Sequence, residues 1–205
     1  MTHSFEHQQQ LTNEQVISID IIAKFVLRQP SIWVLVLGML GSAAAYQWLF
    51  GWGLIDTSLV VLAFILRSFV EWGIHYYIHH AMPLPFINIR LKSIIYRLHI
   101  EHHRKPWKAD ELFMKGRSMF VMLSIPFLLL VFISLRLAIL SVLFAAMILF
   151  FNEVFHAFAH ANVSFNNKWL MRVITNHRNH HQLNPNKYYG VSSLLADRLL
   201  NTTTD

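Results

Sequence analysis

The sequence contains no cysteine among its 205 residues, so disulfide bonds and thiolate metal ligands are both excluded. Charged side chains are also scarce, at 14% of the chain, while hydrophobic residues make up 55%. A soluble globular protein of this size needs more polar surface than that composition supplies. The composition therefore favours a membrane protein, and any metal site in it must use nitrogen and oxygen ligands.

Four apolar segments are long enough, or nearly so, to cross a bilayer as helices, which takes about 20 residues. They are residues 31–55, 57–74, 118–134 and 137–155. Short connections predict that the four helices form two hairpins, with Ser134 to Arg136 interrupting the second long apolar run. The second segment contains Arg67 and Glu71, which we expect to face protein or water along one side.

The basic residues test this topology. The formal net charge is +6, and all 17 Lys and Arg residues except Arg67 and Arg136 fall in residues 1–30, 80–117 and 160–205. Four crossings place these three segments on one side, which the positive-inside rule assigns to the cytoplasm. The charge then requires no nucleic-acid partner. The sequence predicts an integral, multi-pass protein of a bacterial inner membrane or the endoplasmic reticulum, with a cytoplasmic helical cap.

Residues 1–30 are expected to form a separate N-terminal region. They begin with a polar tail, and residues 14–29 have the pattern of an amphipathic helix that lies in the membrane interface and ends before Pro30. The remainder, residues 31–205, is expected to form one membrane-embedded domain.

All 13 histidines except His3 and His7 fall in four short motifs. Residues three or four apart share one face of a helix, so each motif can direct several ring nitrogens at one point. With four crossings all four motifs emerge on the same side, whereas one long crossing of residues 118–155 would separate them. The imidazoles outnumber the ligands that a single ion can use, so the pattern predicts two metal ions close together.

Imidazole suits iron, zinc, copper and nickel alike, so the ligand type alone does not choose among these metals. A carboxylate commonly accepts the hydrogen bond of the other ring nitrogen of a metal-bound histidine. Glu71 and Glu153 lie one helical turn before His75 and His156, and we expect them to take this role. An unbroken helix would pair His75 with His79 rather than with His80.

The motifs EWGIHYYIHH, HIEHHRKPW, HAFAH and HRNHH resemble, in order and spacing, the histidine boxes of the fatty acid hydroxylase and sterol desaturase superfamily. The tail YYGVSSLLADRLLNT is similar to the segment after the fourth box, especially in the fatty acid 2-hydroxylase-like branch. The resemblance runs from about Glu71 to Thr202. It implies an all-α membrane protein with four transmembrane helices and a histidine-lined diiron site in the cap.

The resemblance implies a set of metal ligands made up entirely of histidines: His75, His80, His99, His102, His103, His156, His160, His177, His180 and His181. The first pair in the family is five residues apart, which favours His80 over His79. Because Met82 and Pro83 follow at once, we expect the helix to fray there and let His80 reach the metal. The implied cofactors are two iron ions, for which zinc can substitute in isolated protein, and dioxygen is the implied co-substrate.

The implied activity is oxygen-dependent hydroxylation of an unactivated C–H bond in a membrane lipid, with a fatty acyl chain as the first choice. Desaturation, or sterol or carotenoid oxidation, at the same site is the alternative among enzymes. A metal-binding membrane protein without catalytic activity is the alternative outside enzymes. The chain has no Gly-rich dinucleotide fingerprint and no room for a haem or flavin domain, so we expect a separate electron donor, a ferredoxin or b-type cytochrome with its reductase.

Overall fold

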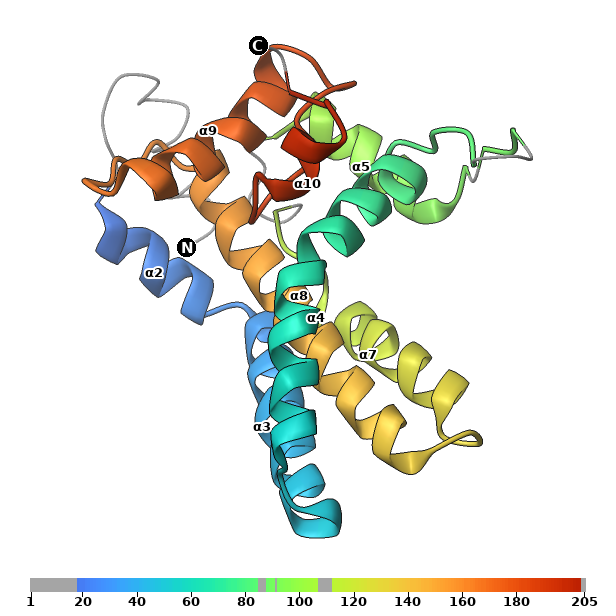
Figure 1. Ribbon diagram of the computed structural model, residues 1–205. Helices are drawn as coiled ribbons and strands as arrows, with labels where there is room; N and C mark the ends of the chain where they lie inside the picture. The colour runs from blue at the N-terminus through green and yellow to red at the C-terminus, as the bar shows by residue number, and fades with distance from the viewer. Residues whose placement is uncertain (1–17, 85–87, 91, 107–111, 204–205) are drawn as a thin grey trace. The chain divides into compact units, whose positions relative to one another are not determined.

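The computed structural model describes residues 18–84, 88–90, 92–106 and 112–203, which form helices, turns and loops without a strand. The expected all-α fold is confirmed for these residues. Four apolar helices form two consecutive pairs along the chain: α3 (Pro30–Phe50), α4 (Leu54–Gly73), α7 (Gly116–Leu130) and α8 (Leu135–His160) (Figure 1). The shorter ones are α2 (Ile19–Leu27), the π-helix η1 (Ile74–His79), α5 (Ile94–Arg104), α9 (Lys168–Gln182) and α10 (Leu195–Leu199).

The chain folds into two compact units, and it passes between them more than once. The histidine unit comprises residues 1–22, 68–112 and 155–205 and contains all four histidine motifs. The hairpin unit comprises residues 23–67 and 113–154. Helices α4 and α8 each begin in the hairpin unit and end in the histidine unit; the first histidine motif follows α4 on η1, and the third lies in the last turns of α8.

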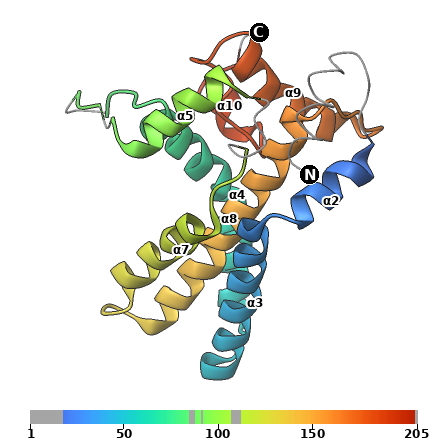
Figure 2. The same cartoon turned by 180° about the vertical axis from the view of Figure 1, so that it is seen from behind.

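Two antiparallel helix pairs make up the hairpin unit. Residues 51–53 join α3 to α4, and residues 131–134 join α7 to α8 (Figures 1 and 2). Gly51 ends α3 at a φ of 69°, a conformation that glycine adopts without a steric penalty. The break in the long apolar run lies slightly before the predicted one, because Arg136 belongs to the first turn of α8.

Close packing between α3, α7 and α8 forms the core of the hairpin unit. Its fully or nearly buried side chains are Leu35, Met119, Leu123 and Ala146. A β-carbon added at Gly38 of α3 would lie 2.9 Å from Leu123 Cδ1, so the glycine lets α3 and α7 approach each other. Small residues allow such close contact in apolar helix bundles, where van der Waals packing is a main force between helices.

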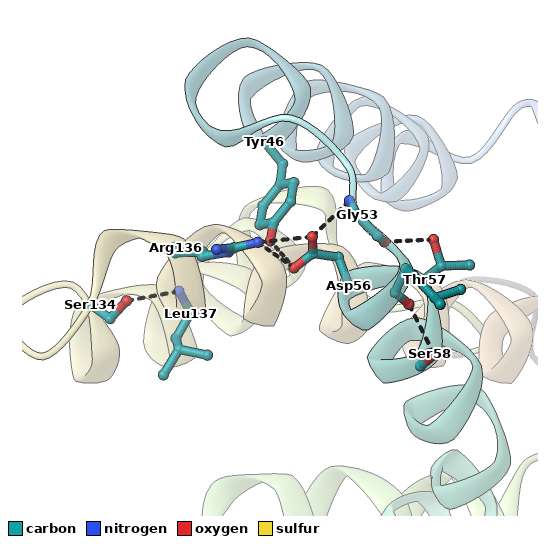
Figure 3. Close-up of polar contacts among 9 residues, drawn as sticks. Tyr46, Gly53, Asp56, Thr57, Ser58, Ser134, Arg136 and Leu137 are labelled. Carbon is teal, nitrogen blue, oxygen red and sulfur yellow. Dashed lines mark hydrogen bonds and ion pairs between the residues drawn. The ribbon is translucent and has the colours of Figure 1, made fainter.

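A buried carboxylate joins the ends of three helices in the same unit. Asp56 accepts hydrogen bonds from the backbone N–H of Gly53 at 2.9 Å, from the hydroxyl of Tyr46, and from Arg136 Nη2 at 2.7 Å (Figure 3). Arg136 Nε also donates to the Tyr46 hydroxyl oxygen at 2.6 Å. These bonds tie the end of α3 and the start of α4 to the start of α8.

Large apolar side chains are exposed on the hairpin unit, among them Trp48, Leu54 and Phe132, with 88%, 83% and 93% of their surface accessible. Exposure on this scale is typical of a surface covered by lipid or by another protein. Helices α3 and α8 are long and apolar enough to cross a membrane, and α7 is apolar but shorter. In α4, Arg67 and Glu71 are buried, as the sequence predicts.

One short helix, α2, precedes α3 in the described residues. Helix α2 covers Ile19–Leu27, within the amphipathic segment predicted over residues 14–29, and its residues Ile22 and Val26 are buried whereas Ile21 and Leu27 are exposed. Pro30 then opens α3, a position that suits proline because its missing N–H has no partner in a first turn. The polar tail before residue 18 lies outside the described residues.

Candidate metal centre

Four helices of the histidine unit each present one histidine motif. The first motif lies on η1 and its C-cap, the second on α5, the third at the end of α8, and the fourth on α9. Helix α5 starts at Ser93, whose side chain accepts the backbone N–H of Tyr96, and α9 starts at Asn167, whose side chain accepts the N–H groups of Trp169 and Leu170. These N-caps fix where both helices begin and hence which face carries their histidines.

A π-helix determines which histidine of the first motif lies beside His75. Between Ile74 and His79 the backbone winds with a hydrogen bond from residue i+5 to residue i, and His80 N donates to His75 O at 3.0 Å. A π turn brings residues five apart onto one face, which an α-helix does not. His80 therefore joins His75 without the fraying that the sequence suggested, and the wider helical turn is the physical reason.

One group of five histidines converges in this unit, and we call it the five-histidine group. Its members are His75, His80, His99, His103 and His180, and their ligand atoms all lie within 4.8 Å of one another. Neighbouring Nε2 atoms are close: His80 to His180 is 2.9 Å, and His99 to His75 and to His103 are both 3.0 Å. Three separate chain segments, η1 with its C-cap, α5 and α9, thus aim the same ring atom at one point.

A second group, the four-histidine group, consists of His102, His156, His160 and His181, again with ligand atoms within 4.8 Å of one another. Three of its Nε2 atoms form a triangle, with sides of 3.0 Å from His102 to His156, 3.1 Å from His102 to His160, and 3.2 Å from His156 to His160. His177 Nε2 lies 3.2 Å from His181 Nε2, which places His177 beside this group. The ten implied ligands are therefore brought together in two neighbouring sets.

The nitrogen spacing fits a metal ion. Two nitrogens bound at about 2.1 Å and at right angles are about 3.0 Å apart, whereas a tetrahedral angle separates them by about 3.4 Å. The observed separations of 2.9–3.2 Å match right angles, as in five- or six-coordinate sites. Hydrogen bonds alone do not explain the arrangement, because a neutral imidazole has one N–H and its other nitrogen is a bare acceptor.

Backbone carbonyls fix the orientation of three rings. The Nδ1 atom of His75 lies 2.6 Å from the carbonyl oxygen of Tyr189, and that of His180 lies 2.7 Å from the carbonyl oxygen of Lys187. In the third motif, Nδ1 of His156 lies 3.1 Å from the carbonyl oxygen of Leu112. A carbonyl only accepts, so each Nδ1 carries the proton and each Nε2 presents its lone pair to the group.

Burial keeps the rings in the form that binds metal. Desolvation, followed by the neighbouring histidines, lowers the pKa of His80 and of His103 to about 3. The pKa of His180 is also lowered to about 3, mainly by desolvation, although the bond to Lys187 O opposes the shift. All three rings are therefore neutral at physiological pH, and neutral imidazole is the metal ligand.

The comparisons with known proteins agree with this geometry. The profile of a family described as fatty acid hydroxylase matches residues 60–202, a stretch that includes all four histidine motifs. The chain belongs to the fatty acid hydroxylase family. No curated protein matches it at a significant level.

A solved structure shares the fold of this chain. It is that of full-length Scs7p, in which only the hydroxylase domain is visible. The two structures align with a TM-score of 0.64 and 20% sequence identity, over 87% of this chain and 69% of that one. At this identity the likeness concerns the fold alone.

The two carboxylates expected beside the histidines accept hydrogen bonds from the backbone. Glu71 accepts the N–H groups of Val191 at 2.5 Å and of Ser192 at 2.7 Å, together with the Ser192 hydroxyl. Glu153, in the hairpin unit, accepts the N–H of Met114 at 3.3 Å. Carbonyl oxygens accept the hydrogen bonds of the ring N–H groups of His75, His156 and His180. The sequence analysis expected carboxylates to accept them.

An arginine that the sequence analysis did not single out joins the third and fourth motifs. Arg178 of α9 donates from Nε to the carbonyl oxygen of Ala159 at 3.0 Å, and from Nη2 to those of Ala161 at 2.6 Å and Val163 at 3.2 Å. These carbonyls lie at the end of α8, where a cation is favourable and intrahelical donors are missing. Its position inside HRNHH is the only signal that the sequence offered.

Proposed function

We propose that this fatty acid hydroxylase inserts oxygen from dioxygen into an unactivated C–H bond of a membrane lipid, with a fatty acyl chain as substrate. The observation that carries the proposal is the convergence of histidine Nε2 atoms from four helices into two adjoining groups. Family membership supports the same reaction class. Such a reaction yields the alcohol and one water, and it consumes two electrons and two protons along with dioxygen.

The two histidine groups would hold two iron ions. The five-histidine group supplies one set of ligands, and the four-histidine group together with His177 supplies the other. Bound iron supplies the redox chemistry with dioxygen, which no amino-acid side chain can perform. Zinc binds the same nitrogen donors and lacks that chemistry, so it would fill the site without activity.

Glu71 and Glu153 would act as positioning residues. Glu71 holds the backbone that follows Tyr189, whose carbonyl orients His75. Glu153 lies three residues before His156 on α8 and holds the backbone at Met114. Neither role requires the carboxylate to touch the metal.

Helices α3, α4, α7 and α8 would each cross the membrane, with the histidine unit as the cap on the cytoplasmic side. The exposed apolar side chains of the hairpin unit and the distribution of Lys and Arg support this topology. The acyl chain would then lie in the hydrocarbon layer with its polar head at the basic face. Depth in the membrane would select the carbon that reacts.

Electrons would come from a separate protein, a ferredoxin or a b-type cytochrome served by a reductase. A donor with an acidic surface suits the basic cytoplasmic face, and their association should weaken as salt rises. Turnover with a purified donor that does not change with ionic strength would contradict this part of the proposal.

The decisive experiment loads the detergent-purified protein with ferrous iron without air, then adds oxygen, a reductant and a lipid extract. Mass spectrometry should find a lipid that has gained one oxygen atom. A product that has lost two hydrogens would instead identify a desaturase. The variants His102→Ala and His180→Ala should lose metal and product while still inserting into the membrane. Two bound metals with no oxygen-dependent product from any lipid would favour a non-catalytic metal protein.

A further inference from the structure

One short segment orients two of the five rings in the five-histidine group. Residues 187–192, which we call the orienting loop, provide the carbonyl of Lys187 to His180 and the carbonyl of Tyr189 to His75. The loop has no regular secondary structure, and Tyr188 within it has a positive φ of 60°. Its conformation therefore depends on side chains that bind its backbone.

Two buried carboxylates bind four consecutive N–H groups of this loop. Asp197, fully buried, accepts the N–H of Tyr189 at 2.9 Å and that of Gly190 at 2.7 Å. Glu71 accepts the next two, from Val191 and Ser192. Charge-assisted hydrogen bonds of this kind are stronger than neutral ones, so they can hold an otherwise irregular backbone.

Asp197 is itself held from two directions. Asn176 Nδ2 of α9 donates to Asp197 Oδ2 at 2.8 Å, and the hydroxyl of Thr202 donates to Oδ1 at 2.5 Å. Each oxygen of Asp197 thus accepts two hydrogen bonds, one from the loop and one from a side chain. Gly190 is required for this fit, because a β-carbon there would lie 2.1 Å from the Ser193 carbonyl oxygen.

The four-histidine group depends on a different support. Among the described residues, the ring N–H of His156 donates a hydrogen bond to the carbonyl oxygen of Leu112. Leu112 is far from the orienting loop in sequence. The two groups therefore differ in what fixes their rings. A change confined to the orienting loop removes ring N–H partners from the five-histidine group, whereas the described ring N–H bond of the four-histidine group does not involve the loop.

We propose that Asp197 and Glu71 are positioning residues that set metal affinity at the five-histidine group alone, by holding the loop whose carbonyls orient His75 and His180. The inference rests on the proposed two-metal site. Loss of an outer hydrogen-bond partner typically lowers metal affinity about 10- to 100-fold. That weakening is expected at one metal ion of the pair.

The two carboxylates respond differently to amide substitution. In Asp197→Asn, whichever oxygen becomes NH₂ faces a backbone N–H of the orienting loop, so at least one of the two loop hydrogen bonds is lost, although the Thr202 hydroxyl can reverse its role. In Glu71→Gln, the remaining oxygen can keep both backbone N–H groups while the new NH₂ donates to the Ser192 hydroxyl, which can reverse its role. Asp197→Asn should weaken one metal by about 10- to 100-fold, and Glu71→Gln should weaken it much less.

A matched control is available in the hairpin unit. Asp56 is also buried and also accepts hydrogen bonds from a backbone N–H and from side chains, but its partners are Gly53, Tyr46 and Arg136 (Figure 3). Asp56→Asn should lower thermal stability and leave both metals bound. It separates a general loss of stability from a specific loss of ligand orientation.

The test is chelator competition on the full-length, detergent-purified protein, with bound metal counted by mass spectrometry. Wild type should hold two ions. Asp197→Asn should release one of them to a chelator whose affinity for the metal is about 10- to 100-fold lower than that needed to remove the same ion from wild type. Adding Asp197→Asn to His156→Ala/His160→Ala should weaken the ion that remains. Adding it to His99→Ala/His103→Ala should not.

The outcomes separate the two proposals. If wild type binds no metal or one ion, the proposed function fails. If wild type binds two and Asp197→Asn releases both in parallel, or neither earlier than wild type, the positioning role is refuted. Should Asp197→Asn not fold, Thr202→Val serves instead, because it removes one bond to Asp197 at a partly exposed residue. It should lower the affinity for the same single ion several-fold. Parallel release of both ions, or release of neither ion earlier than from wild type, also refutes the role.

Discussion

Neighbouring histidines on η1 provide a sharp test of the site, because the π-helix gives them opposite roles. The same substitution, His79→Gln or His80→Gln, removes an imidazole from one of two adjacent residues. In an α-helix, at about 100° per residue, His79 would lie about 40° from His75 and His80 about 140° away. The π turn also brings His80 onto the face of His75, and the ring centroids of His75 and His80 are 5.1 Å apart, against 5.5 Å for His75 and His79.

The magnitude follows from the contacts. His80 Nε2 lies 2.9 Å from His180 Nε2 and 3.1 Å from His99 Nε2, so it would be a direct ligand of an ion held by the five-histidine group. His79 is in neither group, although its ring packs 4.7 Å from that of His99. Losing a direct ligand should cost more than the 10- to 100-fold loss typical of an outer partner, thus more than about 2.8 kcal/mol of binding free energy. Losing a packed ring should change affinity only a few-fold.

The measurement is again release of metal to chelators of graded strength. His80→Gln should release one ion far earlier than wild type and keep the other, whose ligands it does not touch. His79→Gln should keep both. Equal release from the two variants, or earlier release from His79→Gln, would refute the assignment of His80 and with it the functional reading of the π-helix.

Three further predictions concern residues around the rings. Gly190→Ala should disorder the orienting loop, because its β-carbon would lie 2.1 Å from the carbonyl oxygen of Ser193; limited proteolysis should cut there sooner. Arg178→Met should remove three bonds to carbonyls at the end of α8 and lower the melting temperature and metal content together, whereas an unchanged melting temperature would argue against the arginine joining α8 to α9. The pKa values of His103 and His180, depressed to about 3, mean that the unfolded chain binds more protons than the folded one below about pH 6.5. The metal-free protein should therefore lose stability as pH falls from about 6.5 toward 3, which thermal unfolding across pH measures.

Much of the site could be predicted because its signal is local. Helical spacing within each motif places ligands such as His99 and His103 on one face whatever the tertiary structure. The apolar runs likewise predict α3, α4, α7 and α8 to within a few residues, since a helix with few polar groups is readily read from composition.

The parts that sequence reasoning missed depend on groups without a residue signature. Backbone carbonyls of Lys187, Tyr189 and Leu112 orient the rings, and every residue carries the same carbonyl acceptor whatever its side chain. The carboxylates of Glu71 and Asp197 act one step further away, on the N–H groups beside those carbonyls. Periodicity marked Glu71 as important but gave it the wrong kind of partner, and it gave no reason to notice Asp197.

The same indirect support means that metal binding and the fold of the C-terminal residues depend on each other. If holding residues 187–192 raises the affinity of the five-histidine group, a bound ion must stabilise that loop by the same factor, because coupling free energies are reciprocal. The carboxylate of Asp197 and the rings of His75 and His180 then act on opposite sides of one short stretch of backbone. Among the described residues after 181, none belongs to either histidine group, yet the proposal makes the segment that carries Asp197 a support of the candidate metal centre. Substitutions at Asp197 should therefore probe the site more sharply than substitutions at exposed residues nearer to the rings.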